Sequence, residues 1–182
     1  MLYLLMSISL VFLIAGSWIH IKAQAAQWLL QEAWQQTRED GMVHKPWSWA
    51  DHWPVVRLSV PSMKIDQIVL AGDSGNVLAF APGHSQQSRK PGEGGTVVIS
   101  GHRDTHFRFL QYLHNGEVLN LETPFKSFAY QVTGSSIVDV NTTRIDVDAG
   151  SDQLLLVTCY PFDSPVAGGP LRYVIAARPV SI

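Results

Sequence analysis

The sequence has little cysteine and little charge, and both shortages limit what the protein can be. Cys159 is the one cysteine among 182 residues, so no intrachain disulfide can form and no cluster of thiolates can hold a structural zinc ion. Charged residues make up 15% of the chain and apolar residues 46%, which excludes disorder as the main state. The 13 Lys and Arg residues are scattered and are outnumbered by 15 Asp and Glu, which argues against a nucleic-acid partner. The length fits one domain with an appendage.

Charged residues and histidine are also missing from the beginning of the chain, between Leu2 and Ile19. A helix of these 18 residues would be roughly 27 Å long, close to the thickness of a bilayer core. Residues 1–21 are therefore predicted to be a transmembrane anchor. The alternative is a cleaved secretory signal, for which Ala23-Gln24-Ala25 offers a small-residue site. The lack of basic residues before the apolar run, and its length, favour a retained anchor.

Residues 22–54 differ in composition from the rest of the chain. All six tryptophans lie within residues 1–53. Residues 22–40 are rich in Ala, Gln, Leu and Glu, which predicts a helical stalk that stops at Gly41. The segment Lys45–Pro54 contains two prolines and three tryptophans, and we expect an extended connector that packs on a domain surface.

Residues 55–182 contain short β-branched or apolar runs separated by Gly, Pro, Asn and Asp, a pattern that predicts a mainly β domain. One helix is predicted over residues 105–116, with Phe109, Tyr112 and Leu113 on one face. Seven or eight strands imply a barrel or a sandwich, and a closed barrel fits because closure removes free strand edges. The predicted strands are residues 55–60, 64–70, 95–101, 116–122, 128–140, 152–159 and 171–178.

Three residues capable of chemistry lie at the ends of predicted strands. Cys159 ends the run LLLVTC, His102 follows the run TVVISG, and Arg172 opens the run LRYVI. A cysteine nucleophile needs a base within reach, and an imidazole can take the thiol proton and later protonate a leaving amine. An arginine can hold a carbonyl or the oxyanion that develops on it. The three together predict acyl-transfer chemistry.

Simpler interpretations of these residues stay open. A lone cysteine is commonly a buried, inert thiol, and an arginine that opens a strand is commonly a solvated edge residue. His102 and His106 have a spacing that could bind zinc on a helix, with His114 as a third ligand, but His102 precedes the predicted helix. His44, His52 and His84 are interpreted as polar groups of loops.

The segments TVVISGHRDT, LLLVTCYPF and GGPLRYVI, in this order, resemble the sortases, a family of cysteine transpeptidases. The resemblance extends from about residue 47 to residue 182. The segments PWSWADHWPVVRLSVP, LAFAPGHS and TCYPFDSPVAGGPLRY are similar to the single-pass sortases of Gram-negative, often marine, bacteria.

The resemblance implies a closed eight-stranded β-barrel with one or two short helices as the catalytic domain, residues 55–182, behind the N-terminal transmembrane helix. His102, Cys159 and Arg172 would converge on one groove. The cysteine would attack the Thr carbonyl of an LPxTG-like sorting signal and hold a thioester until an amine resolves it. His102 would move the proton, Arg172 would position the signal and stabilise the oxyanion, and Thr158 would help to bind the substrate.

The resemblance also implies a location and a set of partners. The barrel would lie on the extracytoplasmic, periplasmic side of the inner membrane, and the substrate would be a protein with a C-terminal sorting signal. Some sortases use calcium held by clustered acids, but Glu93 stands almost alone in the corresponding stretch, so no cofactor or metal is expected. A hydrolase that uses water would need the same residues. A membrane-tethered β-barrel that binds a partner without catalysis is the alternative from another class.

Overall fold

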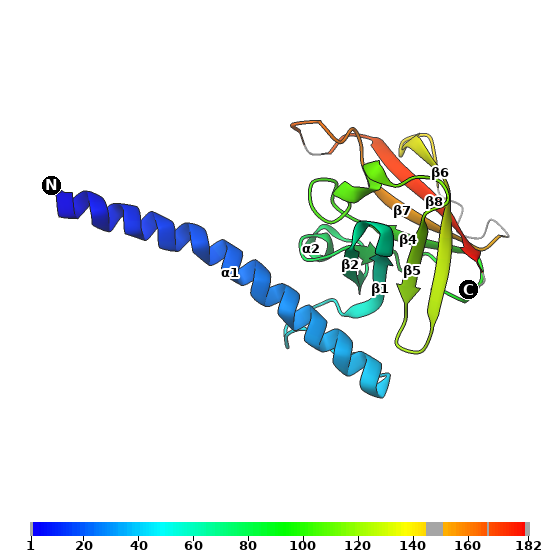
Figure 1. Ribbon diagram of the computed structural model, residues 1–182, viewed down its shortest axis with the longest axis horizontal. Coiled ribbons are helices and arrows are strands. Elements are labelled where there is room, and N and C mark those ends of the chain that lie inside the picture. Colours follow the sequence, from blue (N-terminus) through cyan, green and yellow to red (C-terminus); the bar gives the residue numbers. More distant parts are fainter. Residues whose placement is uncertain (1, 145–150, 167, 181–182) are drawn as a thin grey trace.

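The protein is a closed β-barrel with one long helix attached to its side (Figure 1). The computed structural model describes the backbone of residues 2–144, 151–166 and 168–180, and side chains from residue 21 onward. Within these ranges, strands follow one another around the barrel in the order β1-β2-β3-β4-β7-β8-β6-β5, and β5 pairs with β1 to close it. The strands are β1 (Pro54–Val60), β2 (Ile65–Ala71), β3 (Gly83–His84), β4 (Thr96–Ser100), β5 (Val118–Glu122), β6 (Ser127–Asp139), β7 (Gln153–Cys159) and β8 (Leu171–Val180).

The barrel core consists of the inward side of each strand. In β1 the side chains alternate between buried and partly exposed, so that Val56, Leu58 and Val60 point inward. β4 and β7 are nearly continuous apolar runs that pair in parallel. Such runs are expected for strands whose two faces are both covered. The predicted mainly β closed barrel is therefore confirmed.

One strand was not expected from the sequence. β3 pairs with β2 and β4. It has only two residues, too few to give an alternating pattern in the sequence. A side chain at Gly83 would place its Cβ 2.1 Å from the backbone oxygen of Gly72, so only glycine allows this approach. The interpretation of His84 as a loop residue is wrong: it lies in β3, is buried, and its Nε2 contacts the Arg89 oxygen at 3.0 Å.

The helix predicted over residues 105–116 is also wrong in extent. The structure has only a 3₁₀-helix, η2 (Arg108–Tyr112), preceded by turns. Phe109 and Leu113 are buried as expected, but Tyr112 is 57% exposed. Leu113 lies beyond η2 with an extended backbone, so its burial does not come from sharing a helical face with Phe109 and Tyr112. The other short helices are η1 (Pro61–Met63) and α2 (Gly75–Leu78).

The helix α1 (Leu2–Asp40) is continuous; its first half projects away from the barrel and its second half lies against it (Figure 1). It stops where the sequence indicates, since Gly41 has φ +71° and its N–H donates to the Thr37 oxygen at 3.0 Å. The anchor is predicted over residues 1–21, and the side chains of residues 1–20 lie outside the part that the structure describes. Within the described part, no helix is long and apolar enough to span a membrane.

The second half of α1 is held by a small core of its own. Leu30 and Trp34 of α1 pack with Ile68 and Leu70 of β2 and with Val77 of α2. The side chain of Gln27 adds a hydrogen bond of 2.7 Å to the Phe80 oxygen. The predicted stalk thus lies on the barrel wall.

Replacing Trp34 by alanine is expected to lower the free energy of unfolding by about 3–5 kcal/mol, because a fully buried ring leaves a cavity. Urea unfolding of the full chain measures this. Trp28→Ala is the matched control, since Trp28 lies on the same helix and is 65% exposed; its effect is expected to stay within about 0.5 kcal/mol. Equal midpoints for the two variants would show that α1 is not docked as described.

Candidate active site

Cys159 and Arg172 are direct partners across two neighbouring strands. Cys159 is the last residue of β7, Arg172 is the second residue of β8, and the antiparallel register pairs them. Side chains at such paired positions have Cβ atoms about 4.5–5.5 Å apart. Both side chains are partly exposed. Arg172 is oriented by its own loop, because its Nη1 donates to the oxygens of Gly169 and Leu171 at 2.7 and 2.9 Å.

His102 reaches the same end of the barrel from the other side of β7. β4 runs parallel to β7, with Ser100 level with Val157. The chain keeps this course beyond the strand: the Gly101 N–H donates to the Val157 oxygen at 3.1 Å, and the Thr158 hydroxyl donates to the Gly101 oxygen at 2.7 Å. The paired register ends at Ser100 and Val157, and His102 and Cys159 each lie two residues further along their segments, at the same end of the barrel.

The residue before His102 has to be glycine. A Cβ atom at Gly101 would lie 2.7 Å from the ring of Phe107, and Phe107 is fully buried. The ring therefore fixes the path of the chain from β4 to His102, whose side chain is exposed. The fold thus brings His102, Cys159 and Arg172 to one end of the barrel.

Thr158, to which the resemblance gives a part in binding the substrate, has its side chain turned into the barrel. Its side chain is 2% exposed and its hydroxyl is hydrogen-bonded to the Gly101 oxygen. Through this bond Thr158 holds the backbone that leads to His102. A part for Thr158 in binding the substrate stays a prediction.

Arg103 is a charged residue near the site that was not predicted from the sequence, and it is both buried and hydrogen-bonded. Its side chain is 5% exposed and pairs with Asp104 through Nε at 2.8 Å and Nη2 at 3.1 Å. Asp104 raises the pKa of Arg103, and the negative charges that Cys159 and Asp163 can carry add to the effect. The hydrogen bond from Arg103 in turn lowers the pKa of Asp104. The feature of the sequence that could have indicated this residue is the charged pair Arg103-Asp104, which directly follows His102.

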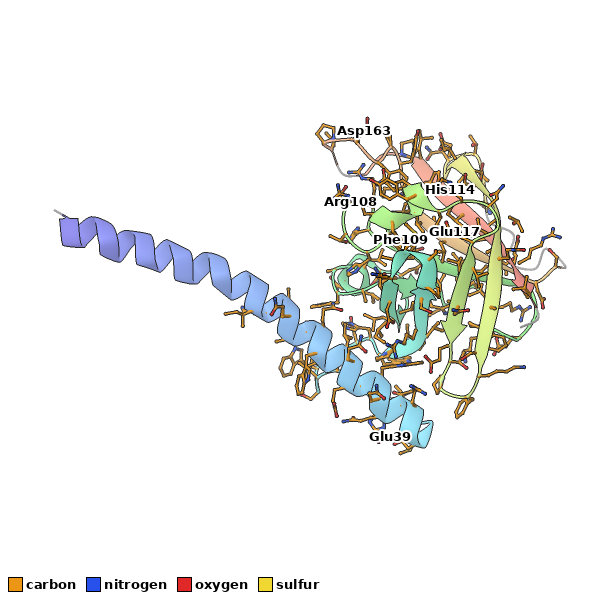
Figure 2. All side chains as sticks on the ribbon, viewed as in Figure 1. Glu39, Arg108, Phe109, His114, Glu117 and Asp163 are labelled. Atoms are coloured by element: carbon orange, nitrogen blue, oxygen red, sulfur yellow. The ribbon has the colours of Figure 1, made fainter. Side chains whose placement is uncertain are left out.

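Three aromatic rings pack together where β7 ends and β8 begins. Tyr160 and Phe162 follow Cys159 in the chain, and both pack on Tyr173, the residue after Arg172, with ring centroids 6.2 and 5.2 Å apart. Figure 2 shows Asp163, which follows Phe162, at the upper end of the barrel, while Glu39 lies at the opposite end. Phe162 and Tyr173 pack against the barrel core. Tyr173 lies on the face of β8 opposite to that of its neighbour Arg172, so the rings cover the end of the core next to the site.

The structure gives no support to a zinc site at His102, His106 and His114. No group of three His, Cys, Asp or Glu side chains in the described ranges lies close enough together to hold a metal ion. His106 is partly buried, and its backbone oxygen accepts a hydrogen bond of 2.9 Å from Gln67.

His106 is expected to make the protein less stable in mild acid. Burial lowers the pKa of His106, and the nearby charge of His102 lowers it further. The unfolded chain therefore takes up this proton at a higher pH than the folded chain, so stability is lost as the pH falls below the ordinary histidine pKa of about 6.5. We expect the Tm to fall between about pH 7 and pH 5, and His106→Gln to reduce this fall. Thermal unfolding followed by circular dichroism measures both; an unchanged profile in the variant would contradict the assignment.

A second concave surface lies at the other end of the barrel. This groove has a volume of about 980 Å³ and includes Met42, Trp53, Lys90, Glu93 and Phe125 in its lining. None of the three strand-end residues lines it. The three candidate residues therefore lie at the end where β4 and β7 finish, away from this groove.

Comparison with known proteins gives a consistent result. Residues 58–180 match the family model of the sortase domain. The chain is 35% identical over 125 residues to sortase D of Bacillus subtilis (strain 168), a match that covers 68% of this chain and 63% of that protein. The chain therefore belongs to the sortase family.

Solved structures show the same fold. A sortase D5 transpeptidase of Clostridium perfringens has a TM-score of 0.69 at 18% identity, over 87% of this chain and 99% of that chain. Sortase A of Corynebacterium diphtheriae has a TM-score of 0.64 at 22% identity, over 74% and 64% of the two chains. Sortase C1 of Streptococcus agalactiae has a TM-score of 0.60 at 26% identity, over 69% and 67%.

Proposed function

We propose that the protein is a cysteine transpeptidase that cleaves an LPxTG-like C-terminal sorting signal and transfers the cleaved protein to an amine. The observation that carries the proposal is the cross-strand pairing of Cys159 with Arg172, with His102 following β4 at the same end of the barrel, on the other side of β7. Membership of the sortase family supports it. A membrane-tethered binding module would not need these three residues at one end of the barrel.

The proposed reaction has two steps. In the first, the sulfur of Cys159 bonds to the Thr carbonyl carbon of the signal, the Thr–Gly C–N bond breaks, and His102 passes the thiol proton to the leaving amine. In the second, an acceptor amine attacks the thioester and loses a proton to His102, and the sulfur leaves with a proton. Arg172 binds the signal and stabilises the oxyanion in both steps; its bonds to the loop carbonyls use Nη1, so Nε and Nη2 are the groups assigned to the substrate.

We also propose that residues 1–21 form a single transmembrane anchor in the cytoplasmic membrane, with the barrel on the extracytoplasmic side. The uncharged run from Leu2 to Ile19 and the unbroken helix α1 support this arrangement. The segments PWSWADHWPVVRLSVP and TCYPFDSPVAGGPLRY support a single-pass sortase of a Gram-negative bacterium, and in such a cell the barrel would lie in the periplasm.

The test uses the full chain with fluorogenic peptides that contain LPxTG-like signals, in the presence and absence of a small amine such as hydroxylamine. We expect cleavage between Thr and Gly and, with the amine present, a product that carries the amine. A cleaved acid as sole product with any amine offered would indicate a hydrolase. Binding of the peptides without cleavage would favour the non-catalytic module and overturn the proposal.

A further inference from the structure

Arg103 joins two segments that are distant in the sequence and adjacent at the site. Its Nη1 donates to the Pro161 oxygen at 2.6 Å, and its Nη2 donates to the Ser164 oxygen at 2.9 Å. Arg103 directly follows His102, and Pro161 lies two residues after Cys159. One side chain thus links the segment that carries the His102 imidazole to the segment that follows Cys159.

The shape of the guanidinium matters more here than its charge. Nε, Nη1 and Nη2 together make four hydrogen bonds, two to backbone oxygens and two to the carboxylate of Asp104. Such a set needs donors fixed in one plane, which the ammonium of lysine does not provide. Asp104 is 65% exposed at its side chain, so solvent screens that ion pair. The bonds to Pro161 and Ser164, made by a side chain that is almost completely buried, are the ones that hold the loop.

The segment that Arg103 holds packs against the end of the barrel core. Residues 160–164 include Tyr160 and Phe162, whose rings pack on Tyr173 of β8. Tyr173 is the neighbour of Arg172, and the register pairs Tyr173 with Thr158. The contacts of Arg103 therefore hold this aromatic cluster in place and link the segment after Cys159 to the segment that carries His102.

We propose that Arg103 is a positioning residue, which fixes His102 and the segment after Cys159 in the arrangement that the reaction needs. The kinetic part of this inference rests on the proposed transpeptidase function. A displacement of about 1 Å at a reacting group lowers a rate about 10²-fold. Loss of the contacts to Pro161 and Ser164 is therefore expected to lower kcat much more than it changes KM.

The experiment compares Arg103→Lys, Arg103→Gln and Asp104→Asn with the wild type, all as the full chain. The folded fraction of each variant is measured by circular dichroism, so that kcat refers to folded protein. Arg57→Gln is the matched control, because Arg57 also makes two bonds to one carboxylate, that of Asp66, on the exposed side of β1 and β2. Hydrogen exchange of the backbone amides of residues 160–166 is measured in parallel.

We expect both Arg103 variants to lower kcat about 10²-fold with KM within about threefold, and to speed exchange in residues 160–166. Asp104→Asn is expected to change kcat only a few-fold, since the two backbone contacts remain. The control keeps wild-type kinetics and exchange. Wild-type kcat in Arg103→Lys, or exchange equal to that of the control, would overturn the inference. If the wild type does not turn over the peptides, the proposed function fails, and the exchange comparison still decides whether Arg103 holds the segment.

Discussion

Cys159→Ala is expected to abolish turnover, with a rate of peptide cleavage at least about 10⁴-fold below that of the wild type. The reason is that the reaction needs a covalent bond to the sulfur, and the chain has no second cysteine. The change is small for the fold, because Cys159 is partly exposed at the last position of β7. We expect the free energy of unfolding to change by about 1 kcal/mol or less. Chromatography of the peptide products and urea unfolding measure the two effects.

The comparison of activity with stability makes this prediction specific. An inert structural thiol would show the opposite pattern, a loss of stability and no loss of cleavage. Thr158→Val is a useful neighbouring variant, since it removes the hydroxyl that holds the Gly101 oxygen and leaves the thiol in place. Cleavage that persists undiminished in Cys159→Ala would contradict the proposed function.

His102→Ala is expected to lower kcat/KM by about 10²–10⁴-fold, the range typical for the loss of a general acid–base. The imidazole side chain is exposed, and the backbone that carries it is fixed by Gly101 and Phe107. Its removal should therefore leave the fold intact. Steady-state kinetics with the fluorogenic peptide, at several pH values, measure the effect.

His114→Ala is the matched control for this prediction. His114 is also exposed, and it lies beyond η2, where its backbone N–H donates to the Glu117 carboxylate. We expect this variant to keep its activity within about twofold. Equal losses in the two variants would mean that neither imidazole has a specific part in the reaction.

Most of the barrel could be predicted from the sequence, because seven strands have both an apolar pattern and Gly, Pro or Asn at their ends. The predicted run of residues 152–159, for example, differs from β7 (Gln153–Cys159) by one residue. β3 could not be predicted, since it has two residues and its place depends on the contact between Gly83 and Gly72. Helical periodicity was misleading over residues 105–116, where buried side chains fit turns and η2 equally well.

The candidate site was predictable in part for a similar reason. His102, Cys159 and Arg172 each stand at a strand end, a local feature that the sequence displays. The function of Thr158 and Arg103 depends on hydrogen bonds to residues more than 50 positions away, to Gly101 and to Pro161 and Ser164. Nothing in the neighbouring sequence indicates such partners, so the burial of the Arg103 and Thr158 side chains became evident only from the fold.

Mass spectrometry of the full chain, quenched with acid during turnover of a sorting-signal peptide, tests the central claim most directly. The account predicts an adduct whose added mass equals the peptide portion up to and including its Thr, attached through a thioester to Cys159 and removed by hydroxylamine. Peptide mapping would place this adduct on Cys159. Cleavage of the peptide without any adduct on Cys159, or an adduct on another residue, would contradict the account.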